Sequence, residues 1–339
     1  MKVDTGLPIH DLSRVPEAAQ RAEALGYDGA LTPETGHDPF LAHALAAEHT
    51  ERIGLGTAVA IAFPRSPMTT AQIAWDLQQL SKGRFHVGLG TQVKGHIVRR
   101  YGMDWVPPGP RMRDYILMMR AIWDSWQNGT RPSFEGEHYR YTLMTPLFSP
   151  ASIEHPHIPI HISAINPYNC RLVGELCDGI KLHPFNTPKY LQEVILPNIE
   201  KGAKKAGRDL KEIEMCGVGF VITGKTEEEV EKAKAPARQQ IAFYASTRTY
   251  QPVLDVQGWG DLCPELYGLS IEGKWQEMGT KITDDMLEEF AITGTYDEIV
   301  PKIKEKCAGV IDRVNFAIPV RSPEDEERLK HMIKELQAA

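Results

Sequence analysis

The chain has 339 residues, of which 42% are hydrophobic and 24% are charged, so it contains enough apolar side chains to form a sizeable core. Its 38 Lys and Arg residues against 45 Asp and Glu residues give a formal charge of −7, which argues against general binding to nucleic acid or to anionic membranes. The sequence contains no apolar run of about 18 residues, so no transmembrane helix is expected. The first residues lack the apolar stretch of a secretory signal. The five cysteines form no CxxC pair, which favours reduced thiols in the cytoplasm.

A short apolar run followed by a helical pattern recurs along the whole chain. Several runs are continuous rather than alternating, as in parallel strands that are covered on both faces. The eight predicted strands are Lys2–Leu7, Gly29–Thr32, Ile53–Ile61, Phe85–Gly90, Ile160–Ala164, Gly179–Leu182, Glu214–Ile222 and Arg313–Ile318. Apolar residues at helical spacing predict the helices Pro16–Leu25, Pro39–Glu51, Thr69–Leu80, Arg111–Trp126, Pro167–Leu176, Pro188–Ala206, Thr226–Ala245, Thr295–Cys307 and Ser322–Gln337.

Eight strand–helix units in succession predict a parallel sheet that closes into a (β/α)8 TIM barrel, an α/β fold. A doubly wound open sheet is the alternative, but it would normally carry G-x-G-x-x-G after its first strand, where this chain has Gly6-Leu7-Pro8. We therefore expect one barrel domain over residues 1–339, with insertions around strands four and five and between strands seven and eight. The second insertion, residues 246–292, is long enough to be a lid or a dimer contact.

Barrel enzymes hold their active site at the carboxyl ends of the strands, so residues there are the first functional candidates. Glu34 and His37 follow the second strand and are the candidate acid–base pair, although a lone Glu in a loop is usually solvated and a lone His is more often structural. Small residues at the ends of the third, fourth and fifth strands leave room for something large and flat. These candidate binding residues are Ala58 and Val59, Thr91 and Gln92, and Ser163 and Ala164.

The turn after the fifth strand, Asn166-Pro167-Tyr168-Asn169, is a candidate anion site. Asn is a good N-cap and Pro fits the first helical position, so the Tyr168 and Asn169 amides are expected at the positive end of a helix. An ordinary helix cap is the alternative.

Metal and nucleotide motifs are weak in this sequence. His155 and His157 precede the fifth strand and therefore lie at the wrong barrel end for a catalytic metal, so together with His161 they predict no metal site. Gly88-Leu89-Gly90 lacks the third glycine of a nucleotide loop, and neither GxSxG nor GxxxxGK[ST] occurs.

In order and spacing, five segments resemble the bacterial-luciferase-like superfamily of flavin and deazaflavin oxidoreductases. They are GYDGALTPETGHDPF (26–40), RIGLGTAVAIAFPRSP (52–67), GRFHVGLGTQ (83–92), ISAINPYNCRLVGELCDGIKL (162–182) and DRVNFAIP (312–319). The resemblance covers nearly the whole chain and is greatest to the branch that uses the deazaflavin coenzyme F420.

That resemblance implies a cis peptide between Ala58 and Val59 and a phosphate-binding turn at Ile165, Asn166, Pro167 and Tyr168. It also implies that Thr91, Gln92 and Lys94 lie along the ring and ribityl chain, with Ser163, Ala164 and Asn169 completing the cofactor set. The acidic coenzyme tail requires local cations, for which the candidates are Arg65, Lys94, Arg99 and Arg100.

The resemblance implies hydride transfer between F420 and an unidentified small organic substrate. An FMN-dependent monooxygenase that needs a flavin reductase is the alternative on the same barrel, and a barrel without redox chemistry is a third. Family sugar-phosphate dehydrogenases carry Asp-His where this chain has Glu34-Thr35, so that substrate class is not expected. A homodimer is expected from the resemblance alone.

Overall fold

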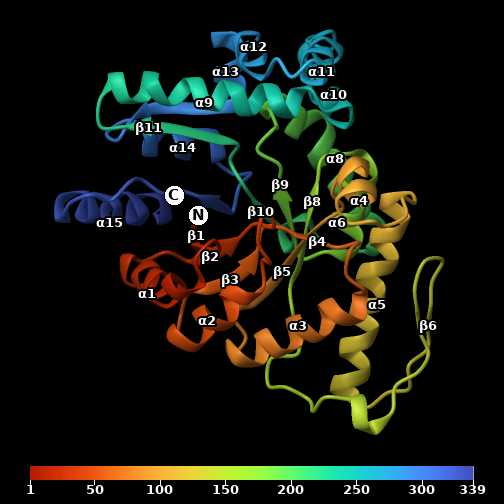
Figure 1. Cartoon of the computed structure of the whole chain (residues 1–339). Helices are drawn as coiled ribbons and strands as arrows, with labels where there is room; N and C mark the ends of the chain where they lie inside the picture. The colour runs from red at the N-terminus through yellow and green to blue at the C-terminus, as the bar shows by residue number, and fades with distance from the viewer. Residues whose placement is uncertain (339) are drawn as a thin grey trace.

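Parallel pairing runs around a closed ring of strands in the computed structural model, which describes residues 1–338. The strands of the ring are β1 (Lys2–Gly6), β2 (Gly29–Thr32), β3 (Gly54–Thr57), β4 (Ala60–Ile61), β5 (Phe85–Gly90), β8 (Ile160–Ala164), β9 (Gly179–Leu182), β10 (Glu214–Cys216) and β13 (Arg313–Asn315). Their order is β3-β2-β1-β13-β10-β9-β8-β5-β4, and a further β3–β5 pairing closes the ring (Figure 1). Because β4 continues the strand begun by β3, the described residues form eight barrel positions, and the predicted (β/α)8 barrel is confirmed.

Helices follow the strands and cover the outside of the barrel. They are α1 (Val15–Leu25), α2 (Leu41–His49), α3 (Pro67–Leu80), α4 (Lys94–Arg99), α5 (Pro108–Asn128), α6 (Pro167–Leu176), α7 (Pro188–Tyr190), α8 (Leu196–Ala206), α9 (Glu227–Ala245), α14 (Ile299–Cys307) and α15 (Pro323–Gln337). The π-helical turn η3 (Leu191–Ile195) joins α7 to α8. Local chemistry sets several ends: the Ser66 side chain accepts from the Thr69 amide at the start of α3, and Gly26, with φ 91°, ends α1.

The seventh predicted strand, Glu214–Ile222, is wrong as a single element. It divides into β10 in the barrel and β11 (Phe220–Gly224), which pairs in parallel with β12 (Ala291–Thr295) in a separate two-stranded sheet. The break falls at Gly217 and Gly219, whose φ values of 121° and 82° are open to glycine but strained for other residues. The two glycines were the sequence signal for this break, inside a run that is otherwise apolar.

The two insertions adopt different structures. The first contains the short antiparallel pair β6 (Phe134–Glu135) and β7 (Arg140–Tyr141). The second is helical, with η5 (Arg248–Tyr250), α10 (Gln251–Gln257), α11 (Leu262–Ile271), α12 (Trp275–Thr280) and α13 (Asp284–Phe290). Figure 1 shows α10–α13 gathered beside α9, on the opposite side of the molecule from α2 and α3. A lid or dimer-contact role for this insertion stays a prediction.

Short 3-10 turns complete the described chain at η1 (Leu12–Arg14), η2 (Pro146–Phe148) and η4 (Leu210–Glu212). Within residues 1–338, no helix combines the length and the apolar character that crossing a membrane requires. All five cysteines are buried and none forms a disulfide.

Candidate active site

The third barrel strand bulges at its carboxyl end, between β3 and β4. The Ala58–Val59 peptide bond there is cis, as the resemblance implies. A Cβ on Gly88 would lie 1.9 Å from the Thr57 carbonyl oxygen, and a Cβ on Gly90 would lie 2.7 Å from the Val59 side chain. The two glycines of β5 therefore make room for the bulge, which explains Gly88-Leu89-Gly90 without a nucleotide.

Glu34 holds the bulge from the neighbouring strand end. One carboxylate oxygen accepts hydrogen bonds from the Ile61 amide and the Arg65 guanidinium, both at 2.7 Å, and the other accepts from the Tyr101 hydroxyl at 3.1 Å. Only 6% of the Glu34 side chain is exposed. Arg65 also pairs with Asp38 at 2.9 Å, so this arginine is committed inside the loop cluster rather than free for a coenzyme tail.

His37 lies in the same loop as Glu34 but in a different environment. It is exposed, and its ring forms no hydrogen bond or ion pair with any other residue between 1 and 338. Its acid–base role, like that of Glu34, stays a prediction.

The end of β5 meets the Glu34 loop through two contacts from the segment that follows it. The Arg100 guanidinium donates to the Thr35 carbonyl, and Tyr101 binds Glu34. Thr91 and Gln92 are half-buried at this end, and Gln92 has the left-handed φ of 55°. Lys94 opens α4 and is exposed, as are Arg99 and Arg100. The structure therefore brings the predicted residues of strands two, three and four together.

The end of β8 adds the predicted phosphate turn beside β5, because β5 and β8 pair directly. Ser163 and Ile165 are half-buried, Ala164 is buried, and Tyr168 is exposed. Asn166 caps α6, since its side-chain oxygen accepts from the Asn169 amide at 2.9 Å.

The cap changes one expectation for this turn. The Asn169 amide is occupied by Asn166, so of the two amides expected to bind an anion, only that of Tyr168 remains. The Asn169 side-chain oxygen, in contrast, is buried without a hydrogen-bond partner among the described residues. A ligand with a hydroxyl or amide donor would satisfy this acceptor.

His183 ends β9 and joins the barrel to the second insertion. Its Nδ1 accepts from the Phe185 amide at 3.1 Å, which leaves Nε2 to donate to the Tyr250 hydroxyl at 3.2 Å. Burial lowers the pKa of His183 to about 4, so the ring is neutral at pH 7. Tyr244 of α9 and Tyr250 of the insertion pack against it, and nothing in the sequence distinguished these two tyrosines from others nearby.

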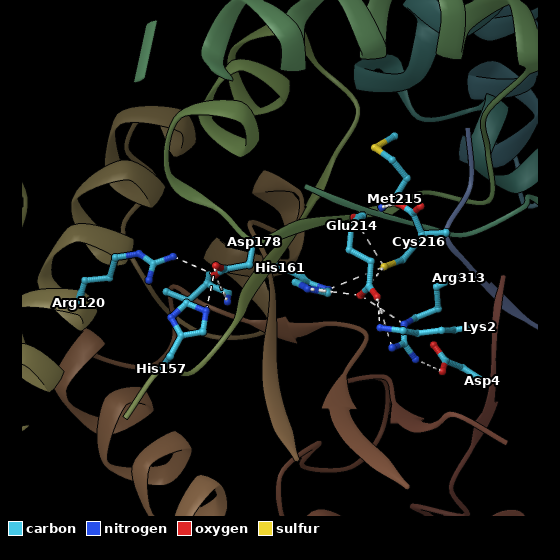
Figure 2. A network of polar contacts seen from close by, with 12 residues as sticks. Lys2, Asp4, Arg120, His157, His161, Asp178, Glu214, Met215, Cys216 and Arg313 are labelled. Atoms are coloured by element: carbon cyan, nitrogen blue, oxygen red, sulfur yellow. Dashed lines mark hydrogen bonds and ion pairs between the residues drawn. The ribbon is translucent and has the colours of Figure 1, made fainter. Parts of the chain in front are cut away.

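A polar network fills the barrel below this site, where branched apolar side chains are usual. Figure 2 shows Asp4, His161, Glu214, Cys216 and Arg313 converging from four strands. Arg313 binds Asp4 and also contacts Glu214 at 3.3 Å. Burial opposes ionisation of Glu214, but Arg313 and Lys2 outweigh it and lower the pKa of Glu214 to about 2. In the sequence, this network is indicated only by charged or His residues within otherwise apolar strands.

His161, Glu214 and Cys216 offer ligand atoms that lie within 4.8 Å of one another, a donor set suited to a metal such as zinc. Glu214, however, is already bound to Lys2 at 2.9 Å as well as to Arg313, and these cations compete with a metal for its carboxylate. His157 does not join the cluster: it pairs with Asp178 at 3.3 Å, away from the barrel interior (Figure 2).

Two cavities lie away from these strand ends. One of about 620 Å³ opens at the amino ends of the barrel strands, beside Lys2, Glu214 and Asp312. The other, of about 370 Å³, lies beside α3 and α5 at Trp75 and Trp126. Neither contains a predicted site residue, so the assignment of the site depends on the convergence of the strand ends and on the bulge.

Known proteins were compared with the chain by family, sequence and structure. A family model described as luciferase-like monooxygenase matches residues 2–313. An uncharacterised protein of Mycobacterium tuberculosis is 44% identical over 93% of this chain and 92% of its own length. A 5,10-methylenetetrahydromethanopterin reductase of Archaeoglobus fulgidus is 26% identical over 86% of this chain and 84% of its own. The solved coenzyme F420 dependent tetrahydromethanopterin reductase of Methanopyrus kandleri matches with a TM-score of 0.77 and 23% identity, covering 100% of this chain and 99% of that one.

Proposed function

Because the chain belongs to the luciferase-like monooxygenase family, it is an oxidoreductase, and we propose that it transfers a hydride between coenzyme F420 and an unidentified small organic substrate. One observation carries the choice of coenzyme: the sequence match to a methylenetetrahydromethanopterin reductase extends over 86% of the chain. A reductase that acts on tetrahydromethanopterin and is described as F420 dependent shares the fold over the full length.

The residues at the strand ends fit such a coenzyme. Gly90 lets the Val59 bulge lie against β5, and the unpartnered Asn169 oxygen can accept from a ribityl hydroxyl. The Tyr168 amide, with the positive end of α6 behind it, would hold the phosphate. When bound, F420 supplies a ring carbon that carries a hydride, as a nicotinamide does.

The chain's own residues would position the reactants and handle the accompanying proton. Thr91, Gln92 and Lys94 would lie along the ring and chain, while Ala58 and Val59 would support the ring from behind. Glu34 already accepts three hydrogen bonds, so its carboxylate is suited to holding the bulge in place. His37 is exposed and unengaged, so its imidazole is free to approach a substrate and carry the proton.

An FMN-dependent monooxygenase is the second candidate, favoured by the family description itself. It would need a flavin reductase as partner to supply reduced FMN. The same strand-end residues would serve either ring, so the two functions must be distinguished by which coenzyme the protein binds.

Fluorescence titration of the purified protein with F420 and, separately, with FMN tests the proposal. We expect F420 to bind, and the Asn166→Ala variant to bind it about tenfold more weakly because the turn loses its cap. Asn128→Ala, at the far end of α5, is the matched control and should bind as the wild type does. Binding of FMN alone would support the monooxygenase, and binding of neither would contradict both candidates.

Assembly and location are part of the same proposal. We expect a homodimer, which sedimentation at equilibrium would detect as twice the chain mass of 38.0 kDa. Five buried cysteines without a disulfide support a reducing compartment such as the cytoplasm.

A further inference from the structure

Lys181 is a buried lysine without a partner. It lies in β9 with 7% of its surface exposed, and its Nζ has no hydrogen-bond acceptor among residues 1–338. A buried ammonium normally forms an ion pair or several hydrogen bonds, because removing an unpaired charge from water is costly. The chain therefore tolerates an unfavourable charge at this position.

The anionic groups around Lys181 are engaged elsewhere. Its charge acts on Asp4, His86, His161 and Cys216, which places its side chain inside the barrel. Asp4 is bound by Arg313. Glu214 is bound by both Arg313 and Lys2.

The remaining neighbours carry no negative charge at pH 7. Burial raises the pKa of the Cys216 thiol to about 12, and burial lowers the pKa values of His86 and His161. Neutral imidazoles and a neutral thiol cannot serve as counterions of the Lys181 ammonium. Asp4, on which the Lys181 charge acts, is already bound by Arg313, and the Nε2 of His86 is itself buried and unpartnered.

Lys181 also lies next to the predicted coenzyme surface. It is in register with Ser163 on the adjacent parallel strand β8. Register partners point to the same face of a sheet, and neighbouring strands lie about 4.8 Å apart. Ser163 is among the residues that we expect to contact the ring. The uncompensated ammonium is therefore directly behind that surface, inside the barrel.

We propose that Lys181 supplies a fixed positive charge that stabilises the reduced form of the bound coenzyme relative to the oxidised form. The inference rests on the proposed function. A hydride that leaves a substrate C–H bond brings both bonding electrons and one proton to the ring, so the oxidised coenzyme becomes more negative by one unit as it is reduced. A preorganised charge in a water-poor interior stabilises such a change without reorganisation, and Lys181 acts through its field as a positioning residue.

The test compares Lys181→Met with the wild type in two measurements. Without coenzyme, the variant should melt a few degrees higher, because an unpaired buried charge has been removed. With coenzyme, the ratio of its affinities for reduced and oxidised F420 should fall about tenfold, which is about 30 mV in the midpoint potential of a two-electron couple. Affinity for oxidised F420 follows from fluorescence, and affinity for borohydride-reduced F420 from competition.

Lys306→Met is the matched control. Lys306 is a half-buried lysine of α14, but its Nζ donates to the Glu289 and Ala291 carbonyl oxygens at 3.2 and 3.3 Å. Its replacement should lower the melting temperature and leave the affinity ratio unchanged.

The outcomes separate the two claims. A wild type that binds neither form of F420 overturns the proposed function and with it this role. If both proteins bind both forms of F420 and the affinity ratio is the same in each, the role of Lys181 is overturned but the proposed function is not. Equal weakening of both forms would also contradict it, because a purely structural defect would leave the ratio unchanged.

Discussion

Glu34 and His37 occupy one loop and differ in what surrounds them. Glu34 receives donors from Ile61, Arg65 and Tyr101, whereas His37 faces solvent. The same two side chains are equivalent candidates in the sequence, because both follow the second strand. The three donors to Glu34 lie 27, 31 and 67 residues away from it in the sequence, and no local pattern predicts contacts across such separations.

Replacing Glu34 by Gln should destabilise the protein. The Gln NH2 group would face N–H and O–H donors that now bind the carboxylate. We therefore expect the free energy of unfolding to fall by about 2 kcal/mol. We also expect F420 binding to weaken as the bulge loosens. Urea denaturation and fluorescence titration measure the two effects. His37→Ala is the paired variant and should change stability by less than about 0.5 kcal/mol. Equal loss of stability in both variants would contradict the anchoring role of Glu34.

Most of the elements that were predicted to their exact ends are strands buried on both faces. Strands Gly29–Thr32, Phe85–Gly90, Ile160–Ala164 and Gly179–Leu182 have the same bounds in the structure, as does the half-exposed helix Pro167–Leu176. Each is a continuous or periodic apolar segment whose ends carry Gly, Pro or polar residues. The predicted strand Glu214–Ile222 failed because apolar residues continue through a change of direction, so that burial alone could not indicate which sheet each half joins.

The bulge between β3 and β4 gives a prediction about β5. Gly88→Ala would place a Cβ 1.9 Å from the backbone oxygen of Thr57, which a side-chain rotation cannot relieve. We expect a loss of at least about 3 kcal/mol in stability, seen as a lower urea midpoint. Gly36→Ala is the control, since a Cβ there meets nothing within 4 Å. Similar midpoints for the two variants would show that β5 can move away from the bulge.

At the scale of the whole molecule, an ionic cluster joins the first, seventh and last barrel strands. Lys2 and Asp4 of β1, Glu214 of β10 and Arg313 of β13 meet there (Figure 2). The barrel as such could be predicted from eight strand–helix units. The charged interior could not, because a single charged residue within a strand does not reveal whether it faces solvent or the barrel axis.

This cluster predicts how stability changes with pH. The pKa of Glu214 is lowered to about 2 from its ordinary value of 4.5, so the folded state favours its ionised form. Its contribution, on the order of 2–3 kcal/mol, is present above pH about 4.5 and is lost as the pH falls towards 2. Glu214→Gln should flatten the stability profile over that range in urea titrations, while the exposed Glu137→Gln should not. Parallel profiles for wild type and Glu214→Gln would contradict this account.

The pairing of β1 with β13 has a consequence for the order of assembly. Lys2 is in register with Arg313, and Asp4 binds Arg313 across a separation of 309 residues, so the ring of strands closes only when its two most distant strands in sequence have met. A nascent chain that lacks β13 leaves one edge of β1 open and Asp4 without its guanidinium partner. Until that pairing forms, the chain is an open parallel sheet with unpaired strand edges, which other strands could join.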